Sequence, residues 1–64
     1  MKNIILATTV IAGEKLTLEQ TPEGTFEINE TKNGGFYGLT ERADRADAIT
    51  HYKYWVEQML TSIA

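Results

Sequence analysis

The spacing of apolar residues changes once along the chain, near residue 44. After this point apolar residues recur at steps of three and four, which predicts one face of an α-helix. The apolar face comprises Ala48, Ile49, Tyr52, Val56, Met59, Leu60 and Ile63. Asp44 is the expected N-cap, because its carboxylate can accept hydrogen bonds from the free amides of the first turn, and Thr40 is the alternative cap. The pattern therefore predicts an amphipathic helix over residues 44–63.

Before residue 44 the apolar residues lie in short β-branched runs or alternate with polar ones, as in strands. Four strands are predicted, over residues 3–12, 15–21, 25–31 and 36–40. They are separated by turn sequences at Gly13-Glu14, at residues 21–25, which contain Pro22 and Gly24, and at Asn33-Gly34. Short links favour an antiparallel meander. The expected fold is α+β, a four-stranded β-β-β-β-α arrangement in a single domain of residues 1–64 with the helix packed on one face of the sheet.

The turns also predict the strand register. A three-residue loop within residues 21–25 places Glu19 directly opposite Glu27, and a two-residue Asn33-Gly34 loop places Ile28 opposite Leu39. The core is then expected where the helix stripe meets the inward side chains of the sheet. This core set is Ile5, Ile11, Leu16, Leu18, Phe26, Ile28, Leu39, Ile49, Tyr52, Val56, Met59 and Leu60.

The first strand is apolar on both faces, although one helix can cover only one side of a sheet. Ile4, Leu6 and Val10 are expected on one face, and Ile5, Ala7 and Ile11 on the other. A twisted sheet could shield this surplus in a monomer, or a second copy could bury it, because an unpaired edge strand is a template for another chain. The second alternative predicts a homodimer with Ile4, Leu6 and Val10 in the interface.

Composition excludes several kinds of function. The 64 residues carry a formal charge of −3 and a pI near 4.9 without a basic cluster, which argues against binding of nucleic acids. The absence of cysteine and the presence of one histidine exclude a zinc shell and fit a cytoplasmic protein. The apolar run of residues 3–12 is too short to span a membrane, and its removal as a signal peptide would delete the first strand.

No residue pattern indicates catalysis or a cofactor. The glycine-rich stretch 33–38 lacks the lysine and helix of a phosphate loop, so a hairpin is expected there. Glu19 and Glu27 could act as an acid and base or bind a cation, but on an open strand surface they are better explained as solvated charges. His51 has no nucleophile or acid within helical reach. We therefore expect a protein that is not an enzyme and holds no metal or cofactor.

A protein partner, basic in character, is the expected ligand. Its candidate contacts are the acidic pair on the sheet and three aromatic residues of types enriched in interfaces: Glu19, Glu27, Phe36, Tyr54 and Trp55. In size and composition alone, the chain resembles small acidic, cysteine-free products of phages and mobile elements, which include inhibitors of bacterial defence systems. This resemblance implies an inhibitor or adaptor, and the pair of Glu19 and Glu27 places its expected binding surface on an acidic sheet face. The alternatives are a self-assembling structural subunit and, third, a small enzyme.

Overall fold

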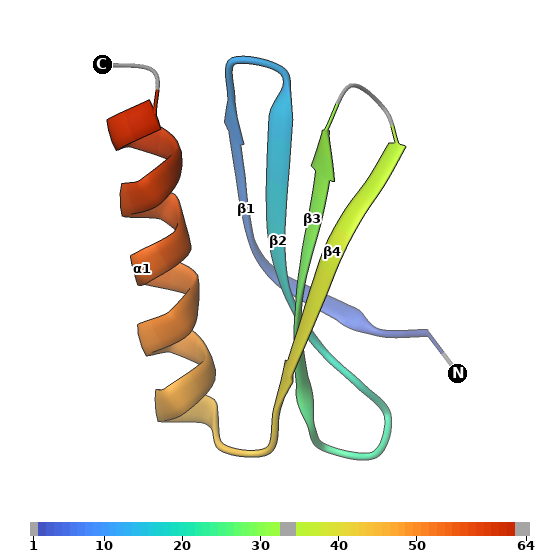
Figure 1. The fold of residues 1–64 in the computed structure, drawn as a ribbon. Coiled ribbons are helices and arrows are strands. Elements are labelled where there is room, and N and C mark those ends of the chain that lie inside the picture. The colour runs from blue at the N-terminus through green and yellow to red at the C-terminus, as the bar shows by residue number, and fades with distance from the viewer. Residues whose placement is uncertain (1, 33–34, 63–64) are drawn as a thin grey trace.

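The computed structural model describes residues 2–32 and 35–62, except for the side chains of Phe36, Tyr37 and Ser62. The chain forms four strands and then one helix. They are β1 (Ile4–Ile11), β2 (Glu14–Gln20), β3 (Phe26–Lys32), β4 (Gly35–Arg42) and α1 (Arg45–Ser62). The strands pair antiparallel in the order β1-β2-β3-β4, and α1 lies against one face of the sheet (Figure 1). The α+β meander predicted from the sequence is confirmed.

Two described turns connect the first three strands. The first lies one residue earlier than the predicted Gly13-Glu14 turn, because Glu14 already belongs to β2 and pairs with Ile11. Ala12 and Gly13 both have positive φ, 50° and 83°, as a two-residue type I′ turn requires. The second turn begins at Thr21, whose amide donates to the carbonyl of Thr25 over 2.9 Å, and Gly24 takes a φ of 92°. This loop sets the register in which Glu19 lies opposite Glu27. The predicted Asn33-Gly34 loop lies outside the described residues.

The helix begins where its capping residue predicts. The Asp47 amide donates to Oδ2 of Asp44 over 3.0 Å, so Asp44 is the N-cap. Asp47 also lies 3.3 Å from Nε of Arg42 and 3.5 Å from Nε2 of His51, which joins the end of β4 to the first helical turns. The expectation that His51 has no acid within helical reach is therefore wrong, because Asp47 lies one turn before it. The alternative cap is wrong, because Thr40 is a residue of β4.

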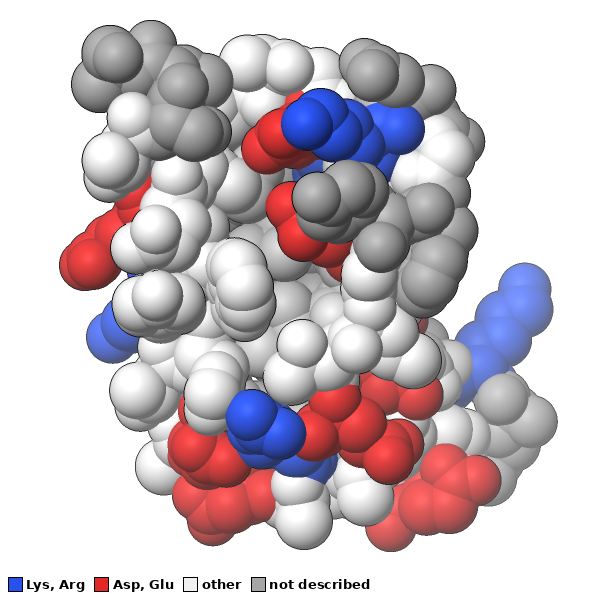
Figure 2. Space-filling view, in the orientation of Figure 1, with Lys and Arg blue, Asp and Glu red and all other residues white. Residues whose placement is uncertain are grey.

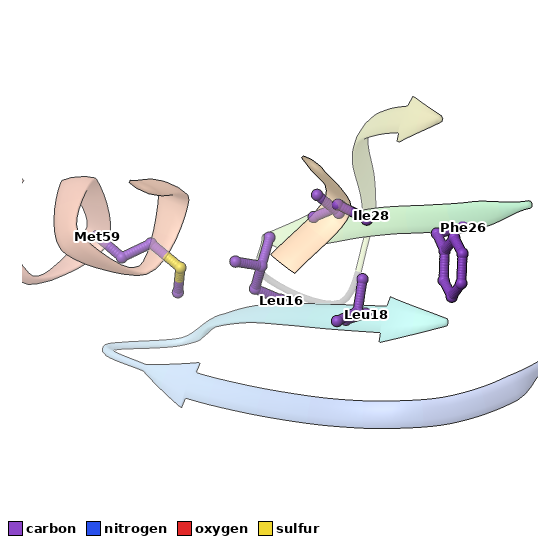
Figure 3. Close-up of a cluster of buried hydrophobic side chains, with 6 residues drawn as sticks. Leu16, Leu18, Phe26, Ile28 and Met59 are labelled. Carbon is purple, nitrogen blue, oxygen red and sulfur yellow. The ribbon is translucent and has the colours of Figure 1, made fainter. Parts of the chain in front are cut away.

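The core is formed by the two central strands and the helix. Leu16 and Leu18 of β2 lie beside Phe26 and Ile28 of β3, and Met59 extends from α1 toward Leu16 (Figure 3). Ala48, fully buried, completes the buried set, and five partly buried residues surround it: Ala7, Ile11, Ile49, Tyr52 and Val56. Most of the predicted core is therefore confirmed, and Ala48 joins it.

The predicted register between β3 and β4 is wrong beyond the turn. Lys32 pairs with Gly35 as expected, but the pairing then skips Tyr37, so that Ile28 pairs with Thr40 instead of Leu39. One extra residue in a strand is a β-bulge, and it moves every later side chain of that strand to the opposite face. Leu39 consequently leaves the core, and its side chain is 53% exposed.

A second bulge, in β1, places Ile5 on the opposite face from the one predicted. Ile5 pairs with Glu19 and Ala7 pairs with Leu18, which leaves Leu6 as the extra residue. Ile5 therefore lies on the face away from the helix and is 61% exposed, so its assignment to the core was wrong. Leu60 is also exposed, because it lies at the margin of the helical stripe while Met59 occupies the centre.

The opposite environments of Ile28 and Leu39 give a direct test of the register. We expect Ile28→Ala to reduce the free energy of unfolding by about 2 to 5 kcal/mol, because it leaves a cavity in the core. The matched truncation Leu39→Ala should reduce it by less than about 1 kcal/mol, since Leu39 is already solvated. Chemical denaturation of both variants measures this, and equal losses would contradict the bulged register.

Candidate functional site

The face of the sheet opposite α1, called here the outward face, carries a row of carboxylates across three strands. Glu19 of β2 pairs with Glu27 of β3, and Glu27 pairs with Glu41 of β4. Ile5 of β1 continues the row beyond Glu19. We call Glu19, Glu27 and Glu41 the acidic ladder. Like charges directly opposite one another in a sheet are destabilising, so this arrangement requires an explanation.

Hydrogen bonds hold the first two carboxylates of the ladder in place. The Asn3 side-chain amide donates to Oε1 of Glu19 over 3.1 Å and to Oε1 of Glu27 over 2.9 Å. Oε2 of Glu19 accepts from Oγ1 of Thr17 over 2.8 Å and from Nδ2 of Asn29 over 3.0 Å. All three donors are neutral. The network orients the carboxylates without cancelling their charge.

The ladder has no cationic partner within the part of the chain that the structure describes. The ion pairs of those residues join Lys32 to Glu14, and Arg42 and His51 to Asp47. The acidic ladder is therefore a region of uncompensated negative charge.

The outward face is hollowed beside the ladder. A shallow cavity of about 440 Å³ is lined by Glu19, Glu27, Thr17, Asn29 and Thr31 together with Ile5, and Lys15 is its one basic residue. Val10 and Leu39, 65% and 53% exposed, add apolar surface to the same face. Protein interfaces commonly combine an apolar centre with a polar rim.

The aromatic candidates lie on the helix, away from the ladder. Tyr54 and Trp55 form an edge-to-face pair with ring centroids 5.6 Å apart, and both are exposed. With Thr50 and His51 they line a shallow, almost wholly apolar hollow on α1. The predicted partner-binding residues thus belong to two surfaces on opposite layers. Phe36 pairs with Thr31 through the backbone, and its side chain lies outside the described set.

Sequence reasoning missed a third feature, a cleft of about 220 Å³ between α1 and β4. Leu16 and Ile28 form its floor, and Glu30, Thr40 and Trp55 line it. A signal was present in the sequence, because a glycine inside a strand, here Gly38, often accompanies a bulge. In Figure 2 uncharged surface covers the middle of this side of the molecule, between charged residues at its two ends.

The positions of the ladder residues predict a stabilising substitution. Glu27 has an acidic neighbour on each side, so Glu27→Gln should raise the free energy of unfolding by about 0.2 to 1 kcal/mol, and the gain should shrink in high salt. Denaturation at low and high salt measures it. Glu23→Gln, in the exposed turn, is the matched control and should change nothing. A Glu27→Gln variant that is no more stable than this control at low salt would contradict repulsion within the ladder.

Comparisons with known proteins do not indicate a function for this chain. Neither the family models and curated proteins compared with the sequence, nor the solved structures compared with the fold, give a match. Within residues 2–32 and 35–62 there is no group of three or more histidine or acidic side chains placed to hold a metal ion. The helix formed by the described residues is not apolar enough over a sufficient length to cross a membrane.

Proposed function

We propose that this chain is a non-enzymatic, cytoplasmic protein-binding module that holds a basic segment of a partner on its outward face. The acidic ladder is the observation that carries this proposal. Three carboxylates in one row form no ion pair with a described residue, and neutral amides keep two of them in a fixed geometry. A partner with lysine or arginine would relieve their mutual repulsion on binding.

The neighbouring apolar residues support a protein partner over a small cation. Ile5, Val10 and Leu39 are exposed on the same face as the ladder. Burial of such side chains contributes affinity, while complementary charges speed association and select the partner. An inhibitor or an adaptor, as phages and mobile elements encode, would act in this way.

The acidic ladder can be tested through association kinetics. A partner captured with the immobilised chain should bind the double variant Glu19→Gln with Glu27→Gln several-fold more slowly, and the rate should depend less steeply on salt. The control double variant Glu23→Gln with Glu57→Gln makes the same charge change at exposed sites elsewhere. Equal association rates for the two double variants would rule the ladder out of the binding surface.

Exposure of β1 supports a second function, self-assembly through this strand. Ile4, Ile5 and Val10 are each more than 60% exposed, and Leu6 is 38% exposed. The strand lies at the edge of the sheet and contains no charged residue that would repel another edge. Two copies could pair their β1 strands antiparallel about a twofold axis and bury these aliphatic side chains.

Charge favours this edge pairing over stacking of two outward faces. Stacked sheets would place one acidic ladder against another, and the carboxylates would lose water without gaining a cation. Pairing at β1 leaves both ladders in solvent on the same side of an eight-stranded sheet. The dimer and the partner-binding face are therefore compatible.

Light scattering at several concentrations tests the dimer. We expect a dimer for the native chain at hundreds of micromolar and a monomer for Leu6→Lys or Val10→Lys, because a lysine at the contact loses hydration without a partner charge. Leu60→Lys, on the exposed side of the helix, is the matched control and should remain dimeric. A monomeric native chain would eliminate this arrangement.

A further inference from the structure

We propose that the cleft between α1 and β4 receives one arginine side chain from the partner, an inference that rests on the proposed function and adds a second contact to it. Its floor is apolar, formed by Leu16 and Ile28. Glu30 is the one charged residue among the described lining residues, and Trp55 lines the cleft from the helix. A long side chain with an apolar stem and a cationic end fits this combination of surfaces.

The state of Glu30 is the strongest argument for a cation. This carboxylate lies on the helix side of the sheet, opposite Leu16 and Gly38, and is half-buried. It takes part in no hydrogen bond or ion pair with another described residue, in contrast to Glu14, which pairs with Lys32 on the same face. A half-buried carboxylate beside apolar groups is costly unless a donor or a cation meets it.

Arginine suits the cleft better than lysine. A planar guanidinium can donate two parallel hydrogen bonds to the Glu30 carboxylate and stack on the Trp55 indole. The ammonium of lysine is a point charge that is more strongly hydrated and offers neither geometry. The edge-to-face contact with Tyr54 gives the indole a neighbour that helps to fix its orientation.

The bulge in β4 accounts for the cleft. With a regular register Leu39 would lie against Ile28, whereas the bulge places Thr40 opposite Ile28 and Gly38 opposite Glu30. The helix side of β4 therefore presents a glycine and a threonine where a leucine would have filled the space. A Cβ built on Gly38 meets no atom within 4 Å, so this position faces open space. Bulges often occur where a strand must redirect side chains around a binding site.

A titration with Nα-acetyl-arginine amide tests the site without any knowledge of the partner. Trp55 is the single tryptophan of the chain, so its fluorescence reports on the cleft directly. We expect saturable binding with a dissociation constant of about 1 to 50 mM, because a single side chain contributes little binding free energy. The citrulline analogue, which has almost the same shape but no charge, should bind at least about tenfold more weakly at equal ionic strength.

Three variants connect the signal to the cleft. Glu30→Gln should weaken binding about tenfold, and Gly38→Val should abolish it by filling the cleft while the melting temperature stays equal or rises. Glu23→Gln, the same charge change in the exposed turn before β3, is the control and should leave the affinity unchanged.

Several results would overturn the proposal. These are no saturable signal below about 100 mM, equal binding of the citrulline analogue, full affinity in Glu30→Gln, and binding by a folded Gly38→Val variant. The probe needs no partner, and none of the three variants alters a residue of the acidic ladder. A negative result would therefore reject the arginine site in the cleft without bearing on the proposed role of the outward face. A negative result for partner binding at the outward face would appear only in the association kinetics of the ladder variants.

Discussion

A single helix on a four-stranded sheet is the constraint on which the rest of this structure depends. The core side chains of the two central strands are buried mainly by α1, with smaller contributions from Ala7 and Ile11 of β1. The core residues of those strands are Leu16, Leu18, Phe26 and Ile28. Each fully buried side chain of this size contributes about 1.5 to 3 kcal/mol, and a chain of this length has few of them. No described helix or strand covers the second face of the sheet. Its side chains must therefore be stable in water or bind something else.

The outward face meets this requirement with polar groups that bond to one another. Asn3 reaches across from the N-terminal residues to two carboxylates, and Thr17, although nine-tenths buried, donates to Glu19. These bonds fix geometry, but the donors carry no charge that would offset the negative charge of the ladder. A surface that retains repulsion in the free protein gains more from a cationic partner than a neutral surface would. In our proposal, the residues whose charges repel one another in the free protein are the same residues that bind the partner.

Both edge strands carry a bulge, and each bulge changes what its strand presents. In β1 the extra residue, Leu6, interrupts the pairing near the N-terminal end and leaves a regular segment from Ala7 to Ile11. In β4 the extra residue, Tyr37, moves Leu39 outward and opens the cleft above Ile28. Bulges are common at sheet edges, because one neighbouring strand constrains an edge less than two constrain a central strand. The irregular positions also border the surfaces for which we propose binding.

The sequence by itself determined the elements, the order of the strands, the N-cap at Asp44 and the opposition of Glu19 and Glu27. Each of these depends on local chemistry: helical or strand period, a capping carboxylate, and a turn whose loop length is encoded by Pro22 and Gly24. Such signals act over a few residues and can be recognised without knowledge of the rest of the chain.

The tertiary structure alone decided the faces of Ile5 and Leu39, the exposure of Leu60 and the existence of the cleft. A bulge changes the parity of a strand. Gly38 is compatible with a bulge but does not require one, and the alternation of residues 35–42 fits a regular strand equally well. Which parity prevails depends on how the side chains of β4 pack against a helix that follows them in the chain. The cleft beside Glu30 results from the bulged register. In this register Gly38 and Thr40 lie on the helix side of β4, where a regular register would have placed Leu39.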